Sequence, residues 1–288
     1  MGKSTFLNSV LKEKVSIVSD IPQTTRHNIR AVLTGSSAQI VFIDTPGMHL
    51  FKDKLVSALN SLAVSSLKDI DAVVYIVDCS RRPFREEERI IKILSRQRAP
   101  VIMALNKIDK SRKYLSDYIN LWENNSKMNA GPLKYFIPIS ALRGTNLDKL
   151  VGSIEEFLPQ GEPFYPVEVK TDFPLSYRVS DIIREKTCCF LKEEVPHGTA
   201  VETISIEDND KLAIIRANIL VSHKSQKLIA VGKKGDMIKR IGISARMDLE
   251  RIFKKKVFLD LKVKLEKDWQ NKPRILQELG YKGVRLTH

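Results

Sequence analysis

The chain begins with a Gly-Lys-Ser-Thr tetrapeptide that directly precedes a helical pattern. Gly2-Lys3-Ser4-Thr5 is followed directly by Phe6-Leu7-Asn8-Ser9-Val10-Leu11. Gly-Lys-Ser-Thr at a helix N-terminus is the second half of a P-loop, in which backbone N–H groups and the Lys bind phosphates and a hydroxyl binds Mg²⁺. Half a motif is weak evidence, because Ser4 or Thr5 could equally cap an ordinary helix. The rest of the chain has to decide between these two interpretations.

Two expected strands lead to a second candidate phosphate segment. Residues 29–33 and 39–43 are rich in β-branched side chains and flank Thr34-Gly35-Ser36-Ser37, which predicts a hairpin. The second strand runs directly into Asp44-Thr45-Pro46-Gly47. A carboxylate at the end of a buried strand, before Pro and Gly, is where a nucleotide-binding sheet places a Mg²⁺ partner and a γ-phosphate contact. The same residues would also make an ordinary turn.

The middle of the chain alternates strands with helices. Residues 72–77 and 100–105 are short continuous apolar runs, as in parallel strands that are buried on both faces. Helical spacing covers residues 54–67, 85–97, 114–127 and 147–158, and a further strand is expected at 135–139. This alternation predicts a doubly wound α/β domain with a mixed, mostly parallel sheet.

Polar residues follow two of these strands, at ends that share one crevice. Asn106-Lys107-Ile108-Asp109 follows one strand, and Ser140-Ala141-Leu142 follows another. The Asp109 carboxylate can accept hydrogen bonds from N1–H and the 2-amino group of guanine, a donor pair that adenine lacks. N–H groups near Ser140 and Ala141 could donate to guanine O6, and the stem of Lys107 can lie along the base. Together with the two earlier segments, this order predicts a guanine-nucleotide site.

As a set, Gly-Lys-Ser-Thr, Thr-Thr-Arg, Asp-Thr-Pro-Gly, Asn-Lys-Ile-Asp and Ser-Ala-Leu resemble the five G motifs of translation-factor-class GTPases. The variant Gln23-Thr24-Thr25-Arg26-His27, together with the sequence beyond residue 170, resembles the bacterial Era GTPase family. The resemblance covers essentially the whole chain. It implies a P-loop GTPase fold, GTP and GDP as ligands, Mg²⁺ as the cofactor, and hydrolysis of GTP to GDP and phosphate.

The resemblance also implies a role for each matching residue. The residues expected at the nucleotide are Gly2, Lys3, Ser4, Thr5, Asp44, Gly47, Asn106, Lys107, Asp109, Ser140 and Ala141. Mg²⁺ would be held by Ser4 and Thr25, and by Asp44 through water. Hydrolysis would depend on Lys3 at the β and γ phosphates, on Thr25, and on the N–H of Gly47 as the γ-phosphate sensor. Thr25 is preferred to Thr24 because it directly precedes the Arg.

Met48 and His49, which follow Gly47, bear on the rate of GTP hydrolysis. Met48 stands where small regulatory GTPases carry a water-positioning Gln, and an apolar side chain cannot orient water. The intrinsic rate is therefore expected to be slow. His49 is expected to be a surface residue of this loop and not a general base.

The chain departs from the family at its first residues. A complete P-loop has an earlier Gly and follows a strand, whereas Met1 stands directly before Gly2 here. That strand is central in this fold, so its neighbours would be left with unpaired backbone groups. We therefore expect the natural protein to start further upstream and a chain of this length to bind GTP poorly, which puts its activity in doubt.

A Pro-rich stretch closes the first domain. Residues 157–166 contain three Pro and one Gly, which end the preceding helix and make a semi-rigid connection. We predict a GTPase domain over residues 1–159, without its first strand and half of its P-loop, a linker over 160–173, and a second domain over 174–288.

The second domain carries a loop suited to nucleic-acid backbone. Its expected order is a helix (180–191), two strands (200–206 and 212–221), the loop Gly232-Lys233-Lys234-Gly235, a helix (236–253) and a strand (257–265). Gly-x-x-Gly allows close approach of a ribose-phosphate chain, because no Cβ stands in the way, and is the signature of a KH domain. The order before the loop resembles the bacterial, type II KH arrangement. The predicted fold is thus a P-loop α/β domain followed by an α+β type II KH domain.

Positive charge is concentrated in the same region. The chain has a net charge of +14, and residues 224–267 hold 14 Lys and Arg against 5 Asp and Glu. Such a segment predicts a polyanionic partner. The expected RNA-binding residues are Gly232, Lys233, Lys234, Gly235, Lys239, Arg240 and Arg246, beside an apolar groove formed by Met237, Ile238, Ile241 and Ile243. Trp269 is expected to be a packing anchor more than a base-stacking platform.

These features favour a GTP-dependent RNA-binding switch. The resemblance implies binding of the 3′ end of 16S rRNA and a role in maturation of the 30S subunit, by a monomer that does not bind DNA. An alternative is a KH-type RNA-binding protein whose GTPase domain is degenerate and insensitive to nucleotide. A GTPase of tRNA modification is disfavoured, because residues 232–235 would then be absent. No apolar run approaches the ~20 residues of a membrane helix, so the expected location is the cytoplasm, with peripheral association at the inner membrane face left open.

Overall fold

The computed structural model describes residues 1–18, 25–47, 54–125, 132–191, 195–196 and 198–281. Within it the chain divides into two compact units. The first unit comprises Met1–Ser16, Asn28–Leu50 and Asn60–Asp172, and the second comprises Ile17–His27, Phe51–Leu59 and Phe173–His288. The second unit is therefore assembled from three separate stretches of sequence.

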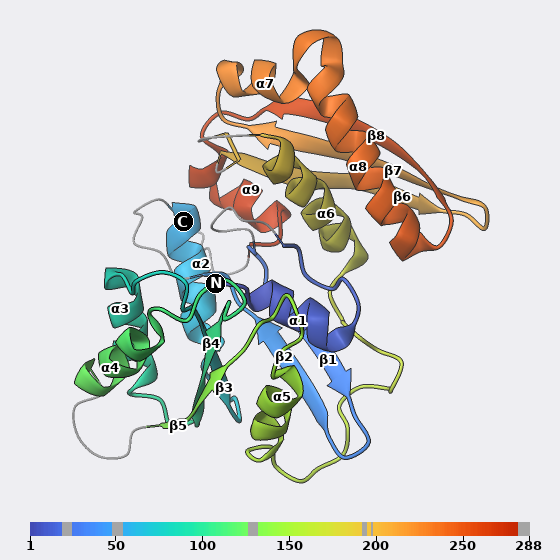
Figure 1. Cartoon of the computed structure of the whole chain (residues 1–288). Helices are drawn as coiled ribbons and strands as arrows, with labels where there is room; N and C mark the ends of the chain where they lie inside the picture. Colours follow the sequence, from blue (N-terminus) through green and yellow to red (C-terminus); the bar gives the residue numbers. More distant parts are fainter. Residues whose placement is uncertain (19–24, 48–53, 126–131, 192–194, 197, 282–288) are drawn as a thin grey trace. The chain divides into compact units, whose positions relative to one another are not determined.

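The elements of the first unit follow the alternation that the sequence predicts (Figure 1). Their bounds are α1 (Lys3–Leu11), β1 (Ile29–Thr34), β2 (Gln39–Asp44), α2 (Lys54–Ser65), β3 (Val73–Asp78), α3 (Arg85–Leu94), β4 (Val101–Asn106), α4 (Leu115–Asn125), β5 (Leu133–Pro138) and α5 (Leu147–Glu155). The first residues of α2 are grouped with the second unit. The expected strands and helices all exist, with ends that differ by a few residues.

The strands of the first unit form two sheets. β1 and β2 make an antiparallel pair, while β3, β4 and β5 make a parallel sheet in that order. In the described residues β2 and β3 do not pair with each other, so each is an edge strand. The mixed, mostly parallel arrangement is confirmed, but as two sheets and not as one. The expectation of a missing strand stays a prediction.

The parallel sheet is buried on both faces, which explains its continuous apolar strands. Alternate residues of β3 and β4, such as Tyr75 and Met103, pack with Ile91 of α3 and Trp122 of α4. The residues between them pack with α1 and α5 and with the β1–β2 hairpin. The two cores hold the strand ends, and hence the segments after them, in fixed positions.

Residues 160–173, expected to be a linker, run along the free edge of β1. The N–H of Val32 donates to the carbonyl of Lys170 over 2.8 Å, and Ala31 forms a β-bridge with Thr171. Gln39 both donates to and accepts from the backbone of Tyr165. These contacts protect an edge that would otherwise expose unpaired backbone groups. The first unit ends at Asp172, one residue before the expected end of the linker.

The second unit has the type II KH arrangement expected from its element order. It comprises α6 (Leu175–Phe190), β6 (Thr199–Asp208), β7 (Leu212–Val221), α7 (Lys224–Val231), a 3₁₀ turn (Lys233–Gly235), α8 (Asp236–Phe253), β8 (Lys256–Leu265), a second 3₁₀ turn (Trp269–Asn271) and α9 (Pro273–Glu278). The sheet order is β6-β7-β8, antiparallel and then parallel. The first helix begins five residues earlier than expected, directly after Pro174, which suits a helix start.

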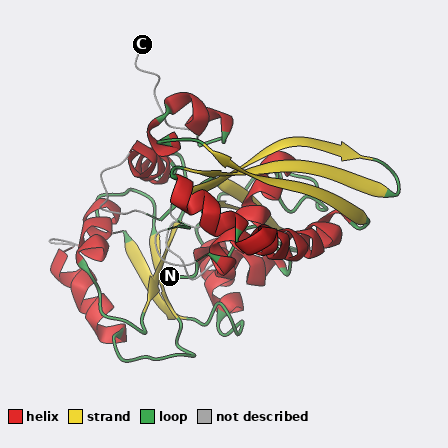
Figure 2. Ribbon diagram, turned by 90° about the horizontal axis from the view of Figure 1, so that it is seen from above, coloured by secondary structure: helices red, strands yellow, loops and turns green. Residues whose placement is uncertain are grey.

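Helices α6 and α8 cover one face of this sheet (Figure 2). Alternate residues of β7, Ala213 to Val221, point into that core and are nearly inaccessible to solvent. Trp269 is fully buried and donates from Nε1 to the carbonyl of Gly198 over 2.9 Å. Its expected role as a packing anchor is confirmed. None of the helices in the described part of the chain is both long and apolar enough to cross a bilayer.

Candidate functional site

The candidate nucleotide residues of the first unit gather where its parallel strands end. Asp78 and Asn106 are the last residues of β3 and β4 and lie in register. Ser140 follows β5. Because the carboxyl ends of parallel strands share one edge of the sheet, the side chains that follow them meet there. The prediction that residues 106–109 and 140–141 come together is confirmed by two hydrogen bonds between them.

The Asn106 side chain connects Met1, at the start of the chain, with the turn at Ala141. Its Nδ2 donates to the carbonyl of Met1 over 2.8 Å, and its Oδ1 accepts from the N–H of Ala141 over 2.9 Å. The side chain is almost completely buried. An amide that bridges two segments in this way fixes their separation, because both its donor and its acceptor are committed.

Gly2 is the residue that lets this contact form. Its φ is +101°, and a Cβ built on it would lie 2.4 Å from Nδ2 of Asn106. Only glycine tolerates both the backbone conformation and the close approach. From Gly2 the chain enters α1, whose first N–H groups, at Lys3, Ser4 and Thr5, have no carbonyl within the helix to bind. The segment thus begins a helix, whose first N–H groups are the kind of donor that binds a phosphate.

Asp109 is held by Ser140. Oγ of Ser140 donates to Oδ1 of Asp109 over 2.5 Å, which orients the carboxylate at the strand ends. The backbone amides behave differently from expectation. The N–H of Ser140 donates to the carbonyl of Thr145, and that of Ala141 donates to Asn106. In this arrangement both amides bind protein acceptors, so a base O6 would have to compete with them.

Sequence reasoning missed Asp78. Its Oδ2 lies 2.6 Å from Nζ of Lys107, and Lys107 itself adopts a left-handed φ of 69°. Burial alone would raise the pKa of Asp78, but the hydrogen bonds from Lys107 and Ser80 outweigh burial and lower the pKa. The carboxylate therefore stays charged and holds the Lys107 stem at the strand ends. Its only sequence signal was a carboxylate at the end of an apolar run.

Two expected Mg²⁺ ligands of the first unit lie together. Oγ of Ser4 donates to Oδ2 of Asp44 over 2.9 Å, and Oγ of Ser16 donates to the same oxygen over 2.8 Å. Asp44 is buried, at 3% exposure. Hydroxyl and carboxylate oxygens are the ligands that Mg²⁺ prefers, so this donor set fits the ion. Gly47 follows in the described chain, while Met48 and His49 lie outside the described residues.

Thr25, the third expected Mg²⁺ ligand, belongs to the second unit in this structure. Arg26 and His27, which follow it, are buried there. The Arg26 guanidinium donates to the carbonyl of Thr199 over 2.8 Å and lies 5.6 Å from the ring centroid of Trp269. Thr24 lies outside the described residues.

His27 makes two polar contacts within the second unit. Nδ1 lies 3.3 Å from Oδ2 of Asp181, and Nε2 lies 2.9 Å from the carbonyl of Leu279. Because both partners are acceptors, only an imidazolium donates to both. The ring also stacks on Tyr177, with 5.0 Å between the ring centroids. Burial would raise the pKa of Asp181, but the charges of His27 and Arg184 outweigh burial and lower it.

The Gly-x-x-Gly loop of the second unit has the conformation that its glycines predict. Gly232 and Gly235 have φ values of 75° and 81°, and Lys234 between them has a φ of 51°. A Cβ on Gly232 would lie 2.7 Å from Cβ of Met237. Lys233 and Lys234 are exposed. The loop therefore presents two cations on a backbone with no side chain at its first position, which suits contact with a phosphate chain.

A groove of about 290 Å³ lies beside this loop, between α8 and the edge strand β8. It is lined by Ile238, Lys239, Gly242, Ile243, Arg246, Val257, Phe258, Leu259 and Leu261. Ile238, Ile243, Lys239 and Arg246 were expected to face RNA, and the structure brings them together here. Apolar walls with two cations at the rim suit unstacked bases and their phosphates.

Four residues at the groove differ from expectation. Ile241 is completely buried in the core and does not line the groove. Met237 packs partly against that core, and the Arg240 guanidinium lies 5.0 Å from the ring centroid of Phe190. Phe258, which is 57% exposed, was missed. The alternating pattern of β8 could have indicated that the Phe258 side chain points outward. It could not have indicated that this strand forms a wall of the groove.

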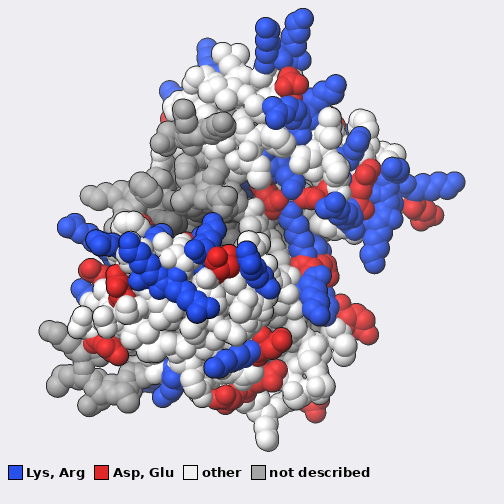
Figure 3. Space-filling view, viewed as in Figure 1, with Lys and Arg blue, Asp and Glu red and all other residues white. Residues whose placement is uncertain are grey.

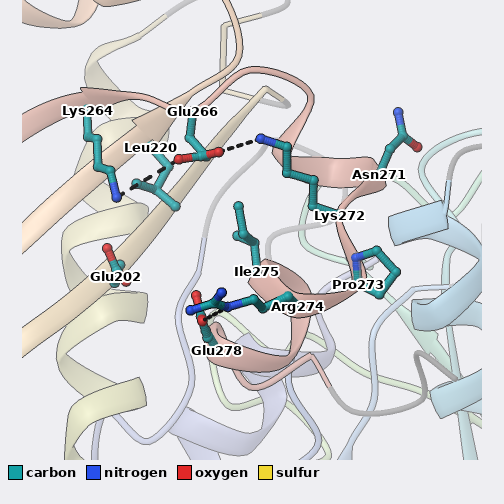
Figure 4. A pocket seen from close by; sticks show the side chains of 10 residues that line it. All are labelled: Glu202, Leu220, Lys264, Glu266, Asn271, Lys272, Pro273, Arg274, Ile275 and Glu278. Atoms are coloured by element: carbon teal, nitrogen blue, oxygen red, sulfur yellow. Dashed lines mark hydrogen bonds and ion pairs between the residues drawn. The ribbon is translucent and has the colours of Figure 1, made fainter. Parts of the chain in front are cut away.

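A second pocket, of about 480 Å³, lies beside α9 (Figure 4). The Lys and Arg side chains that line this pocket form ion pairs with Glu side chains of the same lining. Glu266 pairs with Lys272 at 2.5 Å and with Lys264 at 4.0 Å, and Arg274 pairs with Glu278 at 2.9 Å. Because every Lys and Arg of its lining is committed to a carboxylate, this pocket is poorly suited to a phosphate.

Comparison with protein families gives one match in each unit. The family described as 50S ribosome-binding GTPase matches residues 1–107, and the KH domain family matches residues 194–270. Among curated proteins, GTPase Era of Halothermothrix orenii is 42% identical over 98% of this chain and 95% of its own length. GTPase Era of Geobacter metallireducens is 40% identical over 98% of this chain and 94% of its own length.

Solved structures give the same result. A structure of Era in complex with MgGDPNP and nucleotides 1506–1542 of 16S ribosomal RNA has a TM-score of 0.91, with 37% identity over 97% of this chain and 94% of that chain. A variant of Aquifex aeolicus Era bound to GDP and AlF₄⁻ has a TM-score of 0.90, with 36% identity over 97% and 95%. Because the sequence similarity and the shared fold extend over nearly the full length of these proteins, the chain belongs to the GTPase Era family.

Proposed function

We propose that this chain is a GTP-hydrolysing switch that binds the 3′ end of 16S rRNA and assists maturation of the 30S subunit. The observation that carries the proposal is the coexistence of two built sites in one chain. Asn106 and Asp109 are hydrogen-bonded to the turn at Ser140 and Ala141, and the Gly232–Gly235 loop directly precedes α8, which lines a groove with β8. The Era relative solved with MgGDPNP and 16S RNA supports the pairing of these ligands.

The nucleotide would be held by the first unit. The N–H groups at the start of α1 and Lys3 would bind its phosphates, while Asp109 would accept hydrogen bonds from the guanine edge. Ser4 and Asp44 would hold Mg²⁺, which supplies charge neutralisation for the phosphates. Lys107, fixed by Asp78, would lie along the base. Thr25 and Gly47 are proposed to sense the γ-phosphate.

The RNA would be held by the second unit. Lys233 and Lys234 would contact phosphates at the loop, and bases would enter the groove between Ile243 and Phe258. The outer edge of β8 adds backbone N–H and C=O groups that can bind base edges, since β8 is an edge strand. Lys239 and Arg246 would extend the phosphate path.

Nucleotide and RNA would be coupled through the segment Ile17–His27. This segment is grouped with the second unit, although the residues before and after it, Ser16 and Asn28, belong to the first. Arg26 and His27 anchor it there. A γ-phosphate that repositions Thr25 would therefore have to disturb the contacts of two buried neighbours, which is the kind of two-state element that allostery requires.

We also propose that the protein is a cytoplasmic monomer that can associate peripherally with the membrane.

The test is RNA affinity at fixed salt, measured with a GTP analogue and with GDP. The RNA is one with the sequence of nucleotides 1506–1542 of 16S rRNA. We expect tighter binding with the analogue. Equal affinity in both states would support the alternative, a KH protein whose first unit is insensitive to nucleotide. The observation that favours this alternative is that β1-β2 and β3-β4-β5 form separate sheets in the described part of the first unit. Salt must be held constant because phosphate contacts make any affinity salt-dependent.

A further inference from the structure

Helix α3 of the first unit carries a row of cations on its exposed face. We name Arg85, Arg89, Lys92 and Arg96 the α3 stripe. Their spacing of four, three and four residues places all four on one side of the helix. All four are exposed, whereas Glu87, Ile91 and Leu94 on the opposite side are buried. Arg96 lies two residues beyond the end of α3, and its N–H still donates to the carbonyl of Ile93.

The α3 stripe is not neutralised within the described structure. None of its four cations forms an ion pair with a described acidic residue, although three Glu stand in the first turn of the same helix. Glu87, the buried one of these, is committed to Arg81 at 2.8 Å and to the N–H of Phe84 at 2.8 Å. Elsewhere on the surface, exposed cations such as Arg274 do pair with a Glu of their own helix. The exposed Glu88 lies on the same side of the helix, three residues after Arg85 and four before Lys92, so this face presents four cations and one carboxylate to solvent.

Aromatic rings lie at the N-terminal end of the stripe. Phe84 directly precedes α3, is 57% exposed, and has the Arg81 guanidinium 4.8 Å from its ring centroid. Tyr114, before α4, has Arg82 at 5.8 Å and Lys113 at 5.3 Å from its ring centroid. Rings paired with arginine planes are the surfaces on which unpaired bases stack. Figure 3 shows Lys and Arg side chains, with Asp and Glu among them, over the part of the first unit where Figure 1 draws α3.

The length of the row suits a nucleic-acid strand. At 1.5 Å per residue the stripe extends over roughly 16 Å, a distance over which one strand carries several phosphates at about 3.4 Å of helix axis each. Charge complementarity alone would also suit an anionic lipid surface. The stacking rings beside the stripe, and the KH groove elsewhere in the chain, favour RNA.

We propose that the α3 stripe, with Phe84 at its end, is a second RNA-contact surface that binds the sugar-phosphate backbone of ribosomal RNA independently of the KH loop. It would add phosphate contacts from the first unit to those of the second. Its function would be affinity and placement on a large RNA, because contacts to phosphates carry no sequence information.

The test neutralises the stripe with R85Q, R89Q, K92Q and R96Q in the full chain. Gln is a good helix former, so the helix should persist. The probe is intact 16S rRNA, and the readout is affinity across a range of salt concentrations. Four lost contacts should lower the slope of log affinity against log salt by about 3 and weaken binding about tenfold or more near physiological salt. Far-ultraviolet circular dichroism and melting temperature verify the fold.

Two controls separate a contact from a change in net charge. K12Q, K68Q, K134Q and K149Q remove four exposed cations from other parts of the first unit, and should leave the slope within about 1 of the parent. R85K, R89K and R96K keep the charge and should retain most of the affinity. If the control quadruple lowers the slope as much as the stripe variant does, or if the stripe variant binds as the parent does, the proposal is wrong.

Two further arms distinguish the site from its competitors. The loop variant K233D with K234D should weaken binding by its own factor, and combining it with the stripe variant should multiply the two losses. If the loop variant weakens binding and the stripe variant added to it causes no further loss, RNA is bound by the KH groove and the second contact is wrong. Vesicles of phosphatidylglycerol are the lipid probe: if the stripe variant loses vesicle binding but keeps RNA affinity, the surface is a membrane contact instead.

Discussion

Oγ of Ser4 donates a hydrogen bond of 2.9 Å to Oδ2 of Asp44. The two residues are far apart in sequence, one in the first turn of α1 and the other at the end of β2. Their contact brings a hydroxyl and a carboxylate together where the phosphate segment meets the hairpin. Ser16 donates to the same oxygen but lies outside any nucleotide motif, so it offers a matched control.

For S4A we predict a loss of Mg²⁺-dependent GTP binding of at least about tenfold, as expected when a metal site loses an oriented ligand. S16A removes one hydrogen bond from Asp44 and should have a smaller effect. The measurement is titration of a fluorescent GTP analogue with and without Mg²⁺. A loss of equal size in S16A would mean that Ser4 only supports Asp44 and does not bind the ion.

For D109N we predict a switch of base preference. A carboxamide presents an N–H₂ donor where the carboxylate presented an acceptor, so it disfavours the 2-amino group of guanine and suits the 2-carbonyl of xanthine. GTP affinity should fall by about 10²-fold or more, since the site is left with a mismatched polar pair. Competition between GTP and XTP measures this. S140A keeps the carboxylate and should keep the preference for guanine, and unchanged preference in D109N would contradict the assignment.

Replacing the glycines of the KH loop should give unequal results. In G232A the new Cβ would lie 2.7 Å from Cβ of Met237 and 2.8 Å from its backbone N, whereas in G235A nothing lies within 4 Å. Both changes strain a left-handed backbone by about 1–3 kcal/mol, but only the first also displaces α8. We expect G232A to lose most RNA affinity and G235A to lose less. Equal losses would mean that backbone strain alone matters.

The buried pair of His27 and Asp181 predicts a dependence of stability on pH. The pKa of Asp181 is lower in the folded chain than in the unfolded chain, where it is about 3.9. Between these two values the unfolded state binds more protons, so the free energy of unfolding falls as the pH falls through this window. The stabilisation is fully present above the unfolded pKa.

H27Q tests this linkage. Removing one cation should bring the folded pKa of Asp181 back toward its unfolded value, which flattens the acid limb, and should cost about 1–3 kcal/mol at pH 7 from lost hydrogen bonds. Arg184 continues to pair with Asp181, which limits the loss. Denaturant unfolding between neutral and acid pH is the measurement. D71N, which removes an exposed carboxyl, should change neither quantity.

Local patterns carried most of what could be predicted. The helix at 236–253 was placed at its observed bounds, because an apolar face of period 3.6 and a preceding glycine are both properties of neighbouring residues. Asn106 and Asp109 were assigned for a similar reason, since a polar tetrapeptide directly after a buried strand can only lie at the strand end.

Long-range packing explains what was missed. Nothing near Arg26 and His27 indicates that they pack against Trp269 and Leu279, which lie more than two hundred residues later. Ile241 and Ile243 both looked suited to the groove, yet the phase of α8 against β8 buries one and exposes the other. Such outcomes depend on tertiary contacts that no local pattern specifies.

The second unit includes Ile17–His27, although most of this unit, Phe173–His288, comes much later in the sequence. While the ribosome is still translating this chain, the stretch around Thr25 has already been synthesised, but the residues that enclose Arg26 and His27 emerge last, at Leu279 and Tyr281. This segment therefore gains these contacts only after residues 279–281 have been synthesised. A product that stops before Leu279 would lack the carbonyl to which Nε2 of His27 binds.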